Sequence, residues 1–391
     1  MSTMRCSLPI RERLLNSSLE IVLQLDAMMY GGDAMGRVEG KAIFARGGIA
    51  GEQVRAEIIK DHGRFARARV IEVIQPSPDR VQPRCPHFGF EDTCCGGCAW
   101  QHMAYAAQLR WKTEIVREQL WRLGRISDAP VRDIIPSPDV WAYRNHAQFS
   151  VAPDGRLGFQ SAGSNTVVPI EVCYIVQPPI LEWLRSAGRA QPGVKRVDVR
   201  FPEPHSTIPM YRVKAAPFHV SAESFFQVNT SLIETLVDLV LARLDLQGGE
   251  TVLDGYCGVG FFTRFVAPAA GKVIGVESSP GAVADARRNL AQFGHVELRE
   301  GSVESVLAAL NAPVDAAIFD PPRAGCGPEV IRHSIARKIE RVVYVSCDPS
   351  TLARDARQLV DGGYRLMDVQ PLDMFPHTFH LETVSTWVYS G

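Results

Sequence analysis

One stretch decides the fold of this 391-residue chain: Leu253-Asp254-Gly255-Tyr256-Cys257-Gly258-Val259-Gly260-Phe261. It closes an apolar run and precedes a helical pattern. A glycine-rich turn between a first strand and its helix lets a ligand approach the backbone closely. The next apolar run ends at Glu277, whose carboxylate can accept hydrogen bonds from ribose hydroxyls. The stretch therefore predicts a nucleoside-containing cofactor.

Two cofactors fit such a turn. A dinucleotide needs three glycines to seat its pyrophosphate, and here Thr263 occupies the third position, after Gly258 and Gly260. S-adenosylmethionine has no phosphate and needs fewer backbone donors, so the turn favours it. Asp254 is expected near the amino-acid end of that cofactor. A tight turn without any ligand is the alternative.

The chain from residue 229 onwards alternates strands with helical segments. A helix is predicted over Ser231–Leu246, and this alternation is typical of a parallel α/β sheet covered on both faces. The predicted strands are Thr251–Asp254, Lys272–Glu277, Val296–Arg299, Val314–Asp320, Arg341–Ser346 and Thr383–Tyr389.

The N-terminal part is organised differently. Residues 1–17 show no periodicity and are predicted to be a disordered extension. Residues 18–77 combine short alternating runs with many glycines, which is typical of a small β-barrel. Residues 78–228 are predicted to form a central mixed α+β domain, with one long helix over Tyr105–Leu123 and largely antiparallel sheet after residue 140. Residues 229–391 form the third predicted domain.

Composition sets limits on location and partners. The net charge is −1, so an RNA partner would have to be held by local basic patches rather than by bulk charge. No run of about 18 apolar residues and no signal peptide are visible, so we expect a cytoplasmic protein without a membrane partner. Four of the nine cysteines lie between Cys85 and Cys98. In a cytosolic chain they are not interpreted as disulfides, so the clustering indicates a metal, a redox role or chance.

Two further motifs follow predicted strands. Asp320-Pro-Pro-Arg-Ala-Gly325 should face the cofactor, but Asp-Pro-Pro also suits enzymes that methylate an amino group of a base. Cys347 ends the fifth strand, before a helix that starts near Pro349 and should lower the thiol pKa. A lone cysteine there is more often a small buried side chain. A thiolate that attacks carbon 6 of uracil would activate carbon 5, and a carboxylate such as Glu382 would then remove the carbon 5 proton.

Six motifs in this order resemble those of the RNA uracil-5-methyltransferases, in the branch with a TRAM domain and an iron–sulfur cluster. The resemblance covers nearly everything after residue 17. It rests on Ser224-Phe-Phe-Gln-Val-Asn229, Asp254-Gly-Tyr-Cys-Gly-Val-Gly260, Gly275-Val-Glu277, Asp320-Pro-Pro-Arg-Ala-Gly325, Val345-Ser-Cys-Asp-Pro-Ser-Thr-Leu-Ala-Arg354 and Phe375-Pro-His-Thr-Phe-His-Leu-Glu382.

The resemblance implies a class I S-adenosylmethionine methyltransferase (Rossmann-like) domain with an N-terminal TRAM barrel of the OB-like type. Cys347 matches the nucleophile and Glu382 the general base. Phe261 departs from the pattern, because some members carry a polar residue there. His377 and His380 were equally compatible with a site role and with a surface loop. The implied cofactor contacts are Gln227, Tyr256, Glu277, Asp320 and, more weakly, Ser302.

The same resemblance implies a 4Fe–4S cluster in the central domain. Its ligands would be Cys85, Cys95, Cys98 and Cys173, although the spacing between Cys85 and Cys95 is longer than the family pattern and Cys94 is an alternative to Cys95. A structural zinc is the second interpretation and a chain without metal the third.

The implied partner is RNA, with ribosomal RNA (23S) as the first substrate and transfer RNA as the second. One basic stretch of the barrel could bind phosphates and stack bases: Lys60, Arg64, Phe65, Arg67 and Arg69. A solvated strand face is its alternative. A monomer is expected. The competing functions are an amino-group base methyltransferase, which needs no Cys347, and a non-catalytic RNA-binding protein.

Overall fold

The computed structural model describes residues 19–201 and 210–391. The predicted extension at residues 1–17 lies outside the described residues. The chain separates into two compact units. The first contains residues up to Gln108, with residues 160–168 and 377–379. The second contains residues 109–159, 169–376 and 380–391. Neither unit coincides with the three predicted domains, whose limits remain a proposal.

The first unit contains a closed five-stranded barrel with the strand order β1-β2-β3-β5-β4. Along the strands, side chains that point into the barrel alternate with side chains on its surface. Leu25, Ile43 and Val54 are among the buried side chains that fill the interior. The strands are β1 (Glu20–Met28), β2 (Ala34–Val38), β3 (Lys41–Arg46), β4 (Gln53–Asp61) and β5 (Phe65–Gln75).

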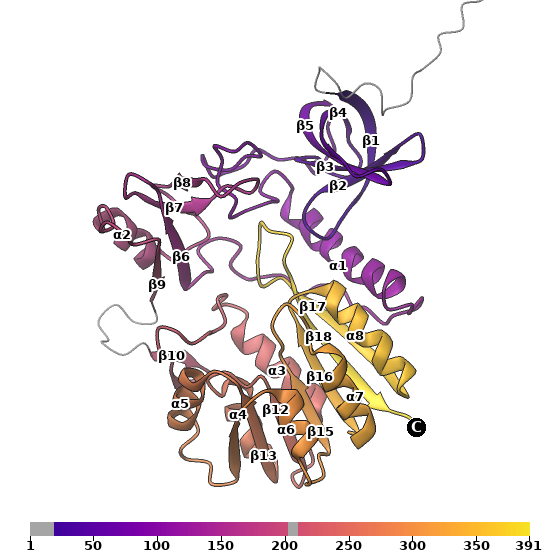
Figure 1. Cartoon of the computed structure of the whole chain (residues 1–391), viewed down its shortest axis with the longest axis vertical. Coiled ribbons are helices and arrows are strands. Elements are labelled where there is room, and N and C mark those ends of the chain that lie inside the picture. Colours follow the sequence, from indigo (N-terminus) through magenta and orange to yellow (C-terminus); the bar gives the residue numbers. More distant parts are fainter. Residues whose placement is uncertain (1–18, 202–209) are drawn as a thin grey trace, which may run out of the picture. The chain divides into compact units, whose positions relative to one another are not determined.

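The second unit is built on a seven-stranded sheet with the order β14-β13-β12-β15-β16-β18-β17 (Figure 1). Five of the six predicted strands are parallel, but the prediction of a parallel sheet is wrong for the last one, because β18 runs antiparallel to β16 and to β17. The strands are β12 (Thr251–Gly255), β13 (Lys272–Glu277), β14 (Val296–Glu300), β15 (Ala316–Phe319), β16 (Arg341–Ser346), β17 (Tyr364–Leu372) and β18 (Glu382–Tyr389).

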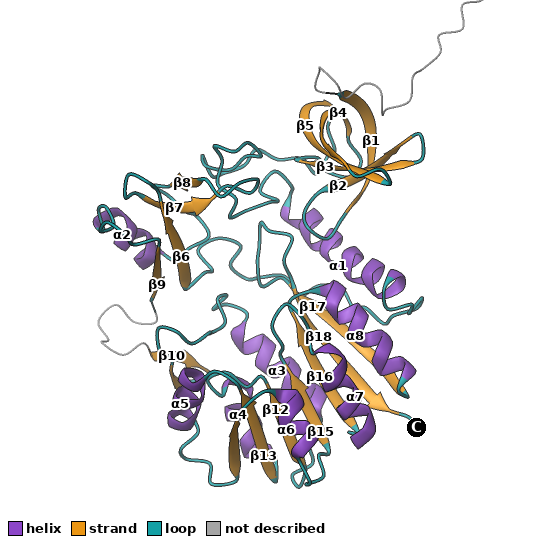
Figure 2. Ribbon diagram, in the orientation of Figure 1, coloured by secondary structure: helices purple, strands orange, loops and turns teal. Residues whose placement is uncertain are grey.

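Helices cover both faces of this sheet, as the alternation predicted. One core packs α6, α7 and α8 against the sheet, and the other packs α3 and α4 against the opposite face (Figure 2). The helices are α3 (Ile233–Leu244), α4 (Phe261–Val266), α5 (Pro280–Asn289), α6 (Val303–Ala309), α7 (Gly327–Arg337) and α8 (Pro349–Asp361), with a 3₁₀ turn η2 at Ala267–Ala269.

The segments between the barrel and this sheet contain the expected long helix and short antiparallel strands. Helix α1 is followed by a four-stranded sheet with the order β8-β7-β6-β9 and by a hairpin of β10 and β11. Helix α2 was not predicted. The elements are α1 (Tyr105–Arg122), β6 (His146–Val151), β7 (Leu157–Gln160), β8 (Val167–Pro169), α2 (Pro178–Ser186), β9 (Arg196–Arg200), β10 (Met210–Val213) and β11 (Ala216–His219). Across the described residues, no helix combines the length and apolarity that crossing a membrane requires.

Candidate active site

The glycine-rich stretch forms a tight turn at the carboxyl end of β12. Gly258 and Gly260 have φ angles of 56° and 81°, and Tyr256 has a φ of 65° although it carries a side chain. Gly260 begins α4. The backbone of this turn is therefore exposed in the conformation that a close ligand requires.

The carboxylate of Glu277 lies against this turn from the neighbouring strand. Its Oε2 accepts a hydrogen bond from Gly258 N at 3.0 Å, and its Oε1 accepts one from Ser279 N at 2.7 Å. Gly301 N donates to the Glu277 carbonyl at 2.9 Å. Ser302 follows directly and caps α6 by accepting a hydrogen bond from Ser305 N. Thus two predicted cofactor contacts, Glu277 and Ser302, lie at the ends of adjacent strands.

Two more carboxyl groups, Asp254 and Asp320, lie at the same sheet edge. Thr263 Oγ1 donates to Asp254 Oδ2 at 2.5 Å, and Asp254 Oδ1 is buried without a partner among the described residues. Burial raises the pKa of Asp254 to about 7. Burial and then the charge of Asp254 raise the pKa of Asp320 to about 7, although Asp320 keeps part of its surface exposed. This edge is prepared for a cationic ligand.

Gln227 and Tyr256 border the turn by different routes. The Phe226 ring packs edge-on against Phe261 with ring centroids 5.6 Å apart, which places the Gln227 backbone beside α4. Phe261 is a buried aromatic side chain, in agreement with its exclusion from the polar contacts. The Tyr256 hydroxyl donates to the Cys326 carbonyl at 3.3 Å.

Cys347 and Glu382 come together through the antiparallel pairing of β16 and β18. Ser346 pairs with Thr383, and Thr383 Oγ1 donates to the Ser346 carbonyl at 3.1 Å. Glu382 is 4% exposed, and its Oε1 is buried without a partner among the described residues. Burial and the nearby Asp320 carboxyl raise the pKa of Glu382, while Arg323 lowers it.

The prediction that the following helix lowers the thiol pKa is wrong. Burial, followed by the charges of Glu382 and Asp320, raises the pKa of Cys347 to about 12. Helix α8 does begin at Pro349, but the Asp348 carboxylate caps it and accepts hydrogen bonds from Ser350 N and Thr351 N. Those amides are therefore directed to Asp348 instead of the thiol.

Arg323 and His380 belong to the site. The sequence assigned no role to Arg323 and left His380 open between a site role and a surface loop. Arg323 lowers the pKa of both Cys347 and Glu382. Its Nη2 lies 3.4 Å from His380 Nε2. Burial, followed by the charge of Arg323, lowers the pKa of His380 to about 4, so its ring is neutral and can accept this hydrogen bond. The sequence signal that could have identified Arg323 is its position in Asp320-Pro-Pro-Arg323, directly after the predicted cofactor contact.

A buried ion pair fixes the segment that leads from β17 towards Glu382. Lys112 of α1 donates to Asp373 Oδ1 at 2.5 Å and to the Phe375 carbonyl at 3.0 Å. Both charged side chains are completely buried. A buried pair of this kind is strongly destabilised when one partner is removed.

The next three residues, His377–Phe379, are held inside the first unit. The His377 carbonyl accepts hydrogen bonds from Ala99 N and Trp100 N at 3.0 and 2.9 Å, and His377 N donates to Gln108 Oε1 at 2.9 Å. The Phe379 ring packs edge-on against Tyr30. His377 is buried, so it is no surface-loop residue. We call residues 377–379 the strap; it precedes Glu382 by three residues.

The cysteine-rich segment has the donors expected of a thiolate site. Gly97 N donates to Cys95 Sγ at 3.4 Å. Burial raises the pKa of Cys85, whereas backbone amides of His87 and Phe88 lower it. Cys173 belongs to the second unit. Within residues 19–201 and 210–391, no group of three or more His, Cys, Asp or Glu side chains is arranged to hold a metal ion.

The barrel stretch with basic residues is partly neutralised. Arg67 pairs with Asp33 at 3.2 Å and Arg69 pairs with Glu57 at 3.0 Å. Lys60 and Arg64 are exposed and form no ion pair among the described residues. The latter two cations remain available to an anion.

Three family descriptions match parts of the chain. Residues 307–387 match tRNA (Uracil-5-)-methyltransferase, residues 252–320 match a methyltransferase domain, and residues 21–71 match the TRAM domain. The first match includes Asp320, Cys347 and Glu382, and the second includes the glycine-rich turn. The third covers the barrel.

Similar proteins extend over almost the whole chain. An uncharacterized RNA methyltransferase of Halalkalibacterium halodurans is 33% identical over 95% of this chain and 97% of its own length. A 23S rRNA (uracil(1939)-C(5))-methyltransferase of Edwardsiella ictaluri is 33% identical over 90% of this chain and 92% of its own. The structure of the tRNA (uracil-54, C5)-methyltransferase of Pyrococcus abyssi, solved with S-adenosyl-L-homocysteine, shares the fold: the TM-score is 0.71 at 24% identity, covering 94% and 99% of the two chains.

Proposed function

Because the chain belongs to the RNA uracil-5-methyltransferase family, we propose that it methylates carbon 5 of a uridine in RNA with S-adenosylmethionine as the methyl donor. The observation that carries this proposal is the placement of Cys347 and Glu382 at the ends of β16 and β18, beside the carboxyl groups of the glycine-rich turn. The relative from Edwardsiella ictaluri favours 23S ribosomal RNA as the substrate, and transfer RNA is the second candidate.

The cofactor would be held by the turn and by the acidic strand ends. Glu277 is oriented by Gly258 N and is suited to ribose hydroxyls. Asp254 and Asp320 offer carboxyl groups to the ammonium and sulfonium charges, and the unpartnered Asp254 Oδ1 fits such a role. The other contacts are proposed to be Gln227, Tyr256 and Ser302. When bound, S-adenosylmethionine supplies an electrophilic methyl group.

Cys347 and Glu382 divide the covalent chemistry between them. The Cys347 thiol first releases its proton to solvent. The resulting thiolate forms a bond to carbon 6 of uracil, and the electron pair of the 5,6 double bond moves to the carbon 4 oxygen, so that carbon 5 becomes nucleophilic. Once carbon 5 carries the methyl group, Glu382 accepts the carbon 5 proton. The double bond then re-forms, and Cys347 leaves as a thiolate.

RNA mapping tests the function directly. We expect 5-methyluridine at one or more positions of ribosomal RNA in cells that carry this gene and its loss without the gene, as measured by mass spectrometry of 23S and transfer RNA. RNA that contains 5-fluorouridine should form a covalent adduct with the enzyme but not with Cys347→Ala. Full activity of Cys347→Ala, with methylation on an amino group, would identify the competing enzyme class; cofactor binding without any methylated RNA would identify a binding protein.

For the cysteine-rich segment we propose a structural 4Fe–4S cluster on Cys85, Cys95, Cys98 and Cys173. The thiol set and the amide hydrogen bonds to Cys85 and Cys95 support it, although the described residues do not assemble three ligands. Anaerobically purified protein should be brown with about four irons per chain. Colourless protein with one zinc would contradict the proposal. Variants of Cys94 and Cys95 would identify the second ligand by loss of iron.

The barrel is proposed to bind RNA through Lys60 and Arg64, beside the stacked rings of His62 and Phe65, whose centroids lie 4.5 Å apart. We further propose a cytoplasmic monomer. Light scattering of the purified full chain at several concentrations tests the oligomeric state.

A further inference from the structure

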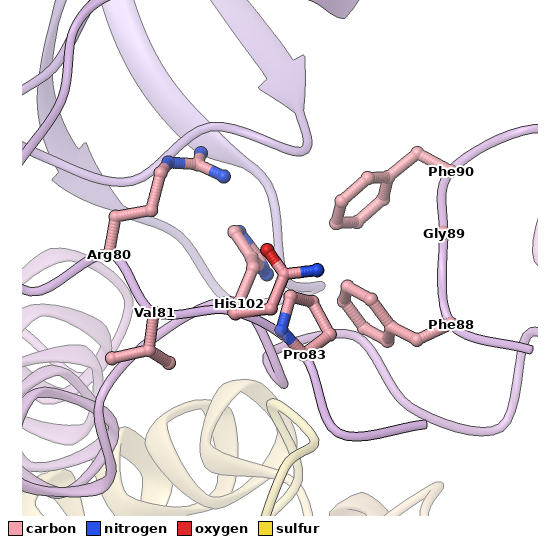
Figure 3. A pocket seen from close by; sticks show the side chains of 8 residues that line it. Arg80, Val81, Pro83, Phe88, Gly89, Phe90 and His102 are labelled. Carbon is pink, nitrogen blue, oxygen red and sulfur yellow. The ribbon is translucent and has the colours of Figure 1, made fainter. Parts of the chain in front are cut away.

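A pocket of about 380 Å³ lies in the first unit, between the barrel end and the cysteine-rich segment (Figure 3). Its size is within the range of small-ligand sites. All of its lining residues belong to the first unit, whereas Cys347 and Glu382 belong to the second. The lining residues are Arg80, Val81, Gln82, Pro83, Phe88, Gly89, Phe90 and His102.

Three aromatic rings dominate the pocket. Phe88 and Phe90 are half-buried and meet edge to face with centroids 5.2 Å apart. The His102 ring stacks on Phe88 at 5.6 Å and meets Phe90 edge to face at 5.0 Å. Figure 3 shows the Phe88 and Phe90 rings directed into the pocket from one loop segment, on the side opposite Arg80. Aromatic faces of this kind stack nucleobases irrespective of base identity.

The backbone fixes the positions of these rings. A Cβ at Gly89 would lie 2.4 Å from Cys94 Sγ, so the chain between Phe88 and Phe90 must pass close to that cysteine. A Cβ at Gly47 would lie 2.9 Å from the Phe90 ring. Phe90 therefore packs against the barrel turn at Gly47. The φ of Gly47 is 87°, a backbone conformation that favours glycine.

The polar groups of the pocket are incompletely satisfied. Burial lowers the pKa of His102 to about 4, and a backbone hydrogen bond to the Gly48 carbonyl opposes this shift. The buried ring nitrogens have no further hydrogen-bond partner among the described residues. His102 is 2% exposed. The His102 ring therefore serves as a buried aromatic wall of the pocket, and its nitrogens are too deeply buried to contact a ligand.

Arg80 is pre-oriented at the rim. Its Nε and Nη2 donate to the Glu52 carboxylate at 2.5 and 2.8 Å, and Nη2 also donates to the Gly47 carbonyl. Glu52 is completely buried, and these bonds leave Arg80 Nη1 with no hydrogen bond to another described residue. Nη1 and the exposed Gln82 amide are the groups that can contact the edge of a stacked ligand.

We propose that this pocket binds an unpaired nucleobase of the RNA substrate, stacked on the face of Phe90 beside the nearly perpendicular Phe88 ring and contacted at its edge by Gln82 and Arg80. The proposal rests on the proposed function for the choice of RNA. It adds a base subsite at the junction of the barrel and the cysteine-rich segment, distinct from the phosphate-binding stretch around Lys60.

The test is a binding measurement that needs no methyl transfer. The probe is a fluorescein-labelled 12-nucleotide single-stranded RNA of mixed sequence, titrated with the full chain and followed by anisotropy. Phe90→Leu should weaken binding about tenfold, whereas Phe90→Tyr keeps an aromatic face and should stay within about twofold of wild type. Trp121→Leu, which changes an exposed aromatic residue elsewhere, is the matched control and should have no effect.

Salt dependence and crosslinking separate stacking from other causes. The logarithm of the Phe90→Leu affinity should fall with the logarithm of salt concentration at the wild-type slope, because no phosphate contact is removed. RNA with 4-thiouridine, irradiated on the protein, should crosslink to the peptide that contains Phe88 and Phe90. Gln82→Ala, at an exposed position, provides a second variant that should weaken binding even if Phe90→Leu proves unstable.

Wild-type affinity in both Phe90→Leu and Gln82→Ala, with crosslinks only elsewhere, would overturn the proposal. Equal loss in Phe90→Leu and Phe90→Tyr would also overturn it, because packing rather than stacking would then be responsible. The proposed function is scored separately by 5-methyluridine formation. Crosslinking at Phe90 without methylation would contradict the proposed function and support the base-binding pocket. Methylation by the wild type together with unaltered RNA affinity in the variants would support the function and contradict the pocket.

Discussion

Cys347 and Glu382 face each other across an antiparallel strand pair, each one residue beyond the last paired positions, Ser346 and Thr383. In a fully parallel sheet, the chain after Cys347 would have to cross back over the sheet before it entered the next strand. A residue at the start of that strand would then lie at the opposite edge of the sheet from Cys347. The antiparallel return of β18 instead brings the second carboxyl group to the thiol directly. The cost is electrostatic, since Glu382 raises the pKa of the thiol beside it.

The Glu382→Gln variant should stop the reaction after methyl transfer. The amide cannot accept the carbon 5 proton, so turnover should fall by about 10²-fold or more, and the covalent RNA adduct should accumulate on denaturing gels. Glu382→Asp, which retains a carboxylate, is the control and should keep part of the activity. Normal turnover of Glu382→Gln would remove Glu382 from the mechanism.

Arg323 should control the reactivity of Cys347. Its positive charge lowers the thiol pKa, so Arg323→Ala should slow alkylation of Cys347 by iodoacetamide about two- to fivefold at pH 8, as a fraction of a pKa unit implies. Arg323→Lys keeps the charge and should react close to the wild-type rate. Mass spectrometry of the Cys347 peptide measures the rate. An unchanged rate in Arg323→Ala would show that the charge does not act on the thiol.

The cofactor-free enzyme should lose stability as the pH rises from about 4 to about 7. Asp254 and Asp320 have pKa values of about 7 in the folded chain, above the ordinary value of 3.8. In that window the folded chain binds more protons than the unfolded one, so the free energy of unfolding falls with pH. Asp320→Asn should flatten the dependence by about 1–3 kcal/mol. Urea denaturation at pH 5 and pH 8 measures it, and parallel curves for both proteins would refute the shift at Asp320.

The Lys112–Asp373 pair should be critical for stability. Lys112→Met leaves the Asp373 carboxylate buried without its cation, so the free energy of unfolding should fall by about 3–5 kcal/mol. The double variant Lys112→Met with Asp373→Asn removes the buried charge and should recover part of that loss. Two equal losses in the single and double variants would show that the cost is due to packing instead.

The sequence predicted the sheet edge correctly but missed what surrounds it. The turn at Gly258 and the strand ending before Cys347 are local patterns, so periodicity sufficed. Strand β17 was missed because Asp368, Gln370 and Pro371 disrupt its apolar pattern. Proline is tolerated there because β17 is an edge strand. The thiol pKa was predicted in the wrong direction because burial and the nearby charges of Glu382 and Asp320 raise it, and no spacing in the sequence reveals these tertiary effects.

Contacts between distant residues were equally invisible in the sequence. The Lys112–Asp373 pair joins residues 261 positions apart. The position of Glu382 at the start of a strand was predicted and is confirmed, but the strap before it was recognised only as part of a motif. Its structure depends on Gln108, Ala99 and Trp100, which no local pattern connects to it.

The strap also has a consequence for how the protein is made. Gln108 and His377 are separated by 269 residues, yet they hydrogen-bond within the first unit. At about 5–20 residues per second, a ribosome needs roughly 15–50 s to pass from one to the other. During that interval the amides of Ala99 and Trp100 lack their His377 acceptor. The first unit thus completes its hydrogen bonding only when the chain as far as the strap, three residues before Glu382, has been made.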